Sequence, residues 1–237
     1  MLNNPKIQEK LSREASDFLS KEFETNVRIG KTSISFFNKI TFYDVCIEGQ
    51  KKDSLFKASE LHAKVDILLL FKRKIVVQQL KIKNMHLYLK NDIVHGNNFD
   101  FFIAALQNRN KTQKKDFFYQ FKSVQFIDCE VRYSSNRKKP KKDIFDINNL
   151  EFKNLDLKIA VNQFSKDSLS ARLKNFSFKE KSGLTVKNIS AIVHANNKNL
   201  DIEDFSVLLP QTTIKTKTVH FHYKSYQSFN HFLDSVS

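Results

Sequence analysis

The chain opens with apolar residues at helical spacing. Between Pro5 and Phe23 they fall three and four positions apart, which places them on one face of a helix. They are Ile7, Leu11, Ala15, Phe18, Leu19 and Phe23. Pro5 suits a first helical turn, and Asn4 can cap it. We expect residues 1–24 to form an amphipathic helix packed on a sheet, with a position on a membrane surface as the alternative.

From Val27 onward apolar and polar residues alternate, as in half-buried strands. Seven segments share one pattern: two alternating apolar residues, then Asn or Asp, then two more alternating apolar residues. They are Ile40–Ile47, Leu80–Leu87, Val124–Val131, Leu150–Leu157, Ala171–Phe178, Leu184–Ala191 and Leu200–Val207. The Asn or Asp shifts the alternation by one residue, which in a regular strand would move the second apolar pair to the other face. A bulge with this residue in a left-handed conformation would keep one apolar face and bend the strand. A turn between two brief strands is the alternative.

These patterns predict a mainly β fold. We expect residues 25–237 to form one highly curved, mostly antiparallel sheet as a single domain, with the helix at its amino-terminal end. Apolar residues within Val65–Arg73 and Asn97–Leu106 predict one or two short helices in addition.

Composition excludes several classes of protein. The chain has 23 Phe but only 4 Gly and 3 Pro, which is unlike a disordered segment. The glycines are too scattered to form a phosphate-binding loop. A net charge of +15 would suit nucleic acid, but most of the 40 basic residues are lysines on strands and in loops, with few arginines. We therefore expect no nucleic acid and no small-molecule substrate; contact with anionic lipid headgroups is compatible with the charge.

The candidate chemistry is sparse. Cys46 and Cys129 are expected to be free, buried thiols, with a disulfide as the alternative. His220 and His222 would point the same way on a strand, but no third metal ligand is evident, so a structural role is expected. No nucleophile elbow is present. We predict no catalytic residue, no metal and no cofactor, and hence no enzyme.

Neither a membrane span nor a signal peptide is predicted. The longest apolar run, Phe101–Leu106, is far shorter than a transmembrane helix, and the first residues are polar.

Several stretches resemble a known family. Val27–Lys31, Ala58–Leu70 and Lys74–Leu87 resemble the amino-terminal region of AsmA-like proteins. Glu180–Val186 and Leu209–Thr216 are more specifically similar to TamB-type translocation and assembly module proteins. The resemblance covers nearly the whole chain, and its motifs are apolar and turn patterns rather than catalytic signatures.

The resemblance implies a repeating, taco-like β-groove lined by apolar side chains. Such proteins are anchored in the inner membrane by an amino-terminal helix and cross the periplasm toward an Omp85-type outer-membrane protein. The implied function is to conduct phospholipid or another acyl-chain ligand and so to aid outer-membrane biogenesis. A scaffold or chaperone that adds strands to a sheet edge during outer-membrane protein assembly or secretion is the alternative. The anchor is absent from this shorter chain, so we expect a segment of a longer protein. The candidate groove residues are Phe42, Ile82, Phe126, Phe152, Leu173, Val186 and Ile202.

Overall fold

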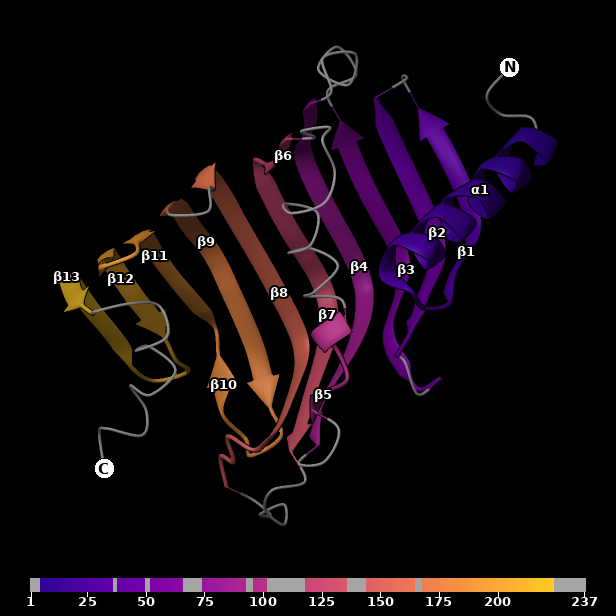
Figure 1. Cartoon of the computed structure of the whole chain (residues 1–237). Coiled ribbons are helices and arrows are strands. Elements are labelled where there is room, and N and C mark those ends of the chain that lie inside the picture. The colour runs from indigo at the N-terminus through magenta and orange to yellow at the C-terminus, as the bar shows by residue number, and fades with distance from the viewer. Residues whose placement is uncertain are drawn as a thin grey trace.

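The computed structural model shows one amino-terminal helix and one large, mostly antiparallel sheet (Figure 1). It describes residues 5–35, 38–49, 52–65, 74–92, 96–101, 118–135, 144–164 and 168–223. Helix α1 spans Pro5–Phe23. Within the described parts of the chain, no helix is both long and apolar enough to cross a bilayer.

The strands follow one another along the chain with few interruptions. Their bounds are β1 Val27–Ser35, β2 Lys39–Glu48, β3 Ser54–Val65, β4 Lys74–Asp92, β5 Gly96–Asn97, β6 Phe118–Phe121, β7 Ser123–Ser135, β8 Asn149–Phe164, β9 Ser168–Glu180, β10 Thr185–Val186, β11 Asn188–Asn196, β12 Asn199–Leu208 and β13 Thr213–His222. Their order across the sheet is β1-β2-β3-β4-β7-β8-β9-β11-β12-β13. The short strands β5 and β6 pair with β4, and β10 pairs with β9. Neighbours are antiparallel except that β6 and β7 run parallel to β4.

The predicted left-handed residues are confirmed in five of the seven segments. Asp44, Asn84, Asp128, Asn154 and Asp204 all have φ between 47° and 53°. Asn and Asp tolerate this conformation better than other residues with a side chain, because their short polar groups can bond locally.

Four of these residues lie at about one level of the sheet: Asp44 on β2, Asn84 on β4, Asp128 on β7 and Asn154 on β8. The pairing of β2 with β3 and of β3 with β4 continues without a shift on both sides of Asp44 and Asn84. The prediction of a bulge with an extra, unpaired residue is therefore wrong at these two positions. At these two positions the neighbouring strands change their side-chain alternation at the same level, so the register is preserved. Beside Asp128 and Asn154 the register does shift, in the pairing of β7 with β8 and of β8 with β9.

The other two segments accommodate the shift in alternation without a left-handed residue. Asn175 is not left-handed; instead the pairing of β8 with β9 shifts by one residue between Lys158 and Ile159. Asn188 starts β11, and Lys187 separates it from β10. The alternative of a break between brief strands thus holds for this segment.

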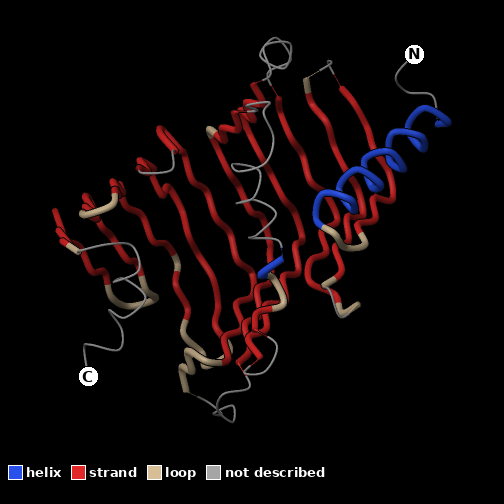
Figure 2. The backbone as a smooth tube through the Cα atoms, viewed as in Figure 1, coloured by secondary structure: helices blue, strands red, loops and turns tan. Residues whose placement is uncertain are grey.

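The sheet is not strongly curled, so the expectation of a highly curved sheet is wrong (Figure 2). The bends do not accumulate into a roll because several of them lie side by side at one level. They bend the sheet along a line that crosses the strands, in addition to the ordinary twist of a β-sheet.

The two predicted short helices lie mainly outside the described residues. Val65 ends β3, and 66–73 are not described. In the second stretch Asn97 belongs to β5, Asp100 and Phe101 are helical, and 102–106 are not described.

Helix α1 packs against β1, as expected, and Leu11, Ala15 and Leu19 of the expected apolar face are half-buried. Phe23 is buried, whereas Phe18 is 60% exposed and Ile7 39% exposed. The side chain buried in the middle of the helix is Ser12. The apolar spacing thus predicted the helix and most of its protected side, but Ile7 and Phe18 lie outside that side and Ser12 lies within it.

Candidate functional site

The apolar face of the sheet carries side chains in rows that cross the strands. In one row Phe42, Leu61, Ile82 and Phe126 stand opposite one another on β2, β3, β4 and β7. The row continues to Leu157 on β8 and Phe176 on β9. Cross-strand pairs of this kind place side chains about 5 Å apart on the same face. A continuous apolar surface therefore crosses the sheet.

A second row lies on the other side of the left-handed residues. Val45 stands opposite Ala58, and Ala58 opposite Met85. Farther along, Cys129 stands opposite Leu155. On β2, β4 and β7 a left-handed residue lies between the two rows and keeps both on one face, since without it the alternation would send one row to the polar side.

The centre of this face is tightly packed. Buried residues of β3 to β10 form one cluster made of Ala58, Ile82, Met85, Cys129, Leu155, Phe178 and Val186. Phe152 meets the Phe178 ring edge-on, with centroids 4.8 Å apart. Phe126 also packs against the cluster.

The seven candidate groove residues therefore fall into two groups. Ile82 and Val186 are 7% and 4% exposed, so an added ligand would reach them only if the packing opened. The others are half-buried: Phe42, Phe126, Phe152, Leu173 and Ile202. Leu173 stands opposite Ala191, and Ile202 stands between Val193 and Val219. The half-buried group holds the side chains that a ligand could contact directly.

The two cysteines do not pair, and the two histidines of β13 each bond a residue of β12. Cys46 and Cys129 are free thiols, and burial raises the pKa of Cys129. His220 Nδ1 lies 2.7 Å from Asp201 Oδ1, and His222 Nδ1 lies 2.8 Å from Asn199 Oδ1. Each histidine thus has its own cross-strand partner. Among the described residues no group of three His, Cys, Asp or Glu side chains could hold a metal ion.

The polar face carries ion pairs between neighbouring strands. Glu60 Oε2 lies 2.9 Å from Lys83 Nζ and 2.6 Å from His62 Nε2. These hydrogen bonds, the one from Lys83 first, hold the pKa of Glu60 below its ordinary value. Farther along, Glu151 Oε1 lies 2.9 Å from Lys153 Nζ and 3.5 Å from Arg132 Nη2. Such exposed pairs contribute little stability each, but they mark this face as the solvated one.

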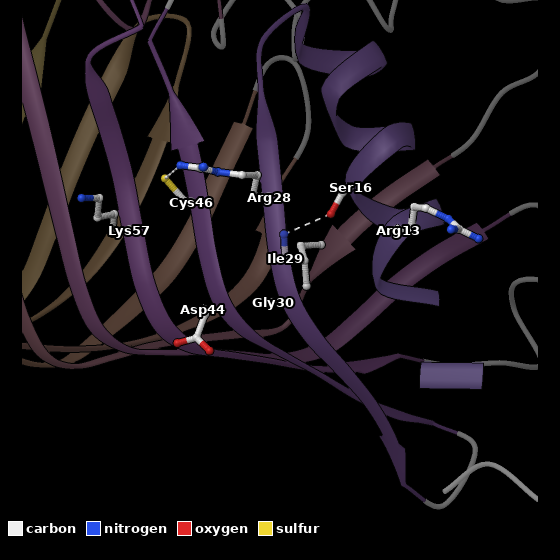
Figure 3. A pocket seen from close by; sticks show the side chains of 8 residues that line it. All are labelled: Arg13, Ser16, Arg28, Ile29, Gly30, Asp44, Cys46 and Lys57. Carbon is white, nitrogen blue, oxygen red and sulfur yellow. Dashed lines mark hydrogen bonds between the residues drawn. The ribbon is translucent and has the colours of Figure 1, made fainter. Parts of the chain in front are cut away.

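A hollow of about 550 Å³ lies between α1 and the polar face of β1 and β2 (Figure 3). Its cations come from Arg13, Arg28 and Lys57. Arg28 turns toward Cys46 and also pairs with Glu48, while Arg13 points to the opposite side of the hollow (Figure 3). The cations diverge, so they form no common anion site. Sequence reasoning did not find this hollow, because its residues come from four separate elements.

Comparison with known proteins adds no relative: no family model matches the chain, and no curated protein matches it.

Proposed function

We propose that the apolar face of this sheet binds acyl chains, and that the chain is a segment of a TamB/AsmA-like envelope protein that conducts phospholipid along a β-groove. The observation that carries this proposal is the row of apolar side chains that crosses the strands, half-buried except for the buried Ile82. Acyl chains require apolar walls and no fixed hydrogen-bonding group, so such a row suffices.

The dimensions of the sheet suit a conduit. The main path crosses ten described strands. At a spacing of about 4.8 Å between strands, a row that crosses all of them is roughly 40 Å long. The rows run across the strands, so a ligand could move from strand to strand along a uniform surface.

The charge of the chain is consistent with a lipid ligand. Lysines of the polar face and of the sheet ends would meet anionic headgroups, which fits the net charge of +15. In the intact protein we place this segment in the periplasm, tethered to the inner membrane through an amino-terminal helix. Its outer-membrane partner would be an Omp85-type protein. The role is transfer and not catalysis.

Two neighbouring aromatic residues allow a matched test. Phe42 and Tyr43 are adjacent on β2 and point to opposite faces, Phe42 into the apolar row and Tyr43 toward Lys31, whose Nζ lies 6.0 Å from its ring centre. A photo-reactive phenylalanine analogue at position 42 should crosslink to phospholipid during expression or in vesicles. The same analogue at position 43 should crosslink far less.

The same pair supports a binding measurement. Phe42→Glu should lower the binding of a fluorescent fatty acid by about tenfold or more, because a carboxylate in the row must be desolvated when the chain binds. Tyr43→Glu is the control and should leave binding unchanged. Equal crosslinking at 42 and 43, or no fatty-acid binding by the folded wild-type protein, would reject the proposal.

Strand addition is the second candidate function, and β13 is the observation that favours it. Among the described strands β13 pairs only with β12, so its other side offers unpaired backbone groups. A photo-reactive residue at Thr218 should then capture unfolded outer-membrane protein rather than lipid. Capture of lipid alone at both Thr218 and Phe42 would leave only the first candidate.

A further inference from the structure

Helix α1 lies along the free side of β1 and faces it with serines (Figure 1). Ser12, Ser16 and Ser20 are four residues apart and therefore form one stripe. Ser16 Oγ accepts a hydrogen bond of 3.0 Å from the backbone N–H of Ile29. Ser20 Oγ accepts one of 2.9 Å from the N–H of Val27 and donates one of 3.2 Å to the carbonyl of Val27.

These serines bond the groups that a neighbouring strand would otherwise pair with. Among the described strands β1 pairs only with β2. The outward N–H and C=O groups of such an edge strand are a template for further pairing. Since Ser16 and Ser20 fill part of that template, α1 occupies a strand-pairing surface.

The edge of β1 is complementary to itself. Its apolar-face residues stand opposite those of β2 and are spaced symmetrically along the strand; they are Val27, Ile29, Thr32 and Ile34. A two-fold axis perpendicular to the sheet would bring β1 of a second copy alongside, antiparallel, with both apolar faces on the same side. In the register that aligns these residues, Val27 lies opposite Ile34 of the other copy and Ile29 opposite Thr32.

The charged residues of β1 do not oppose this pairing. In the same register Arg28 faces Ser33 of the second copy, and Lys31 faces Gly30. No two like charges stand directly opposite, which would have been destabilising.

We propose that α1 closes a strand-pairing surface on β1 and that this surface, once opened, takes β1 of a second copy of this chain. The helix thereby keeps the sheet from joining another sheet at its amino-terminal edge. The proposal does not depend on lipid binding.

The test is the double variant Ser16→Ala/Ser20→Ala in the full chain. Alanine is a better helix former than serine, so any loss of docking cannot come from a weaker helix. Loss of one hydrogen bond of about 1 kcal/mol predicts amide exchange at Val27 and Ile29 about fivefold faster or more. Sedimentation velocity should show a concentration-dependent dimer of the variant and a monomeric wild type. Ser16→Ala/Ser20→Glu, which places a carboxylate against the Val27 carbonyl, should strengthen both effects.

The matched control and a register test complete the experiment. Asp17→Ala also raises helix propensity, but Asp17 is exposed and bonds nothing on β1 in the described residues, so this variant should stay monomeric. In the double variant, Ser33→Glu should tighten the dimer through Arg28 of the other copy, and Ser33→Lys should weaken it.

Three results would overturn the proposal. One is unchanged exchange at Val27 and Ile29 in both serine variants. Another is faster exchange without association. The third is a dimer that is indifferent to the charge at position 33.

Discussion

Replacement of Asn84 tests whether the left-handed residues shape this sheet. Asn84 has φ of 49°, is exposed, and donates a 3.0 Å hydrogen bond from Nδ2 to Ser59 Oγ. Asn84→Val would force a β-branched residue into this conformation, at about 1–2 kcal/mol. It would also remove the exposed hydrogen bond, which contributes about 0.5 kcal/mol. We expect a total loss of about 2 kcal/mol.

Glycine separates the two contributions. Asn84→Gly loses the same hydrogen bond but adopts the left-handed conformation without steric cost. We expect it to change stability by less than about 1 kcal/mol, partly because glycine makes the unfolded chain more flexible. The difference between the two variants therefore isolates the backbone conformation.

Asn175 supplies a control from the same sequence pattern. It occupies the equivalent place in its segment, but its φ is negative and the register shift beside it absorbs the extra residue. Valine suits an ordinary strand position. Asn175→Val should therefore cost less than about 1 kcal/mol, including its 3.5 Å hydrogen bond to the Asp156 carbonyl.

Urea unfolding measured by circular dichroism gives the three free energies, with the slope checked for each variant. In a thermal scan a loss of 2 kcal/mol corresponds to a fall in Tm of roughly 4–8 °C for a chain of this size. Equal losses for valine and glycine at position 84 would show that the left-handed conformation does not matter, as would a loss for Asn175→Val as large as for Asn84→Val.

Two further predictions concern stability. Burial alone would raise the pKa of Glu180, but hydrogen bonds from Ser182 and from the backbone N–H of Glu151 hold it below its ordinary value. Stability from this carboxylate is therefore present above about pH 4.3, the pKa of an unfolded glutamate, and is lost as the pH falls through the lower folded value. The free energy of unfolding of Glu180→Gln, measured at several pH values, should fall less steeply toward acid pH than that of the wild type. An equally steep fall would contradict this cause. Cys129 is 1% exposed within the packed cluster, so Cys129→Leu should cost about 1–3 kcal/mol by overpacking; a calorimetric Tm equal to that of the wild type would show that the cluster has room.

The class of fold and the apolar face of most strands follow from the amino-acid sequence alone. Alternation places Phe42 and Ile82 on one side of their strands whatever the neighbours are, because the side-chain period of a strand is two. The phase shift at Asn84 also demanded a local solution, and Asn and Asp favour the left-handed one. These properties are local, so a single sequence suffices to predict them.

How each shift in alternation is accommodated depends on the neighbouring strands and is visible only in the folded sheet. Asn84 and Asn175 stand in the same pattern, yet one is left-handed and the other lies beside a register shift. The difference depends on the partner strand, which is remote in sequence. The parallel pairing of β4 with β7 is likewise a matter of connection and not of local pattern. For the same reason the bends align and the sheet stays open, where the pattern alone suggested a strong curl.

For the helix and for the candidate site too, some properties follow from local sequence and others depend on neighbouring strands. Apolar spacing predicts α1 but cannot show that Ser16 and Ser20 face β1 while Phe18 stays exposed. That depends on the free backbone groups of β1, which hydrogen-bond the two serines. The spacing also cannot show which side chains of the apolar face are buried and which are accessible. Ile82 is buried because strands on both sides pack around it, and Phe42, which belongs to the same row, is only half-buried nearer the edge. Burial of a side chain is a sum over neighbours, and in this sheet the neighbours are set by strand order.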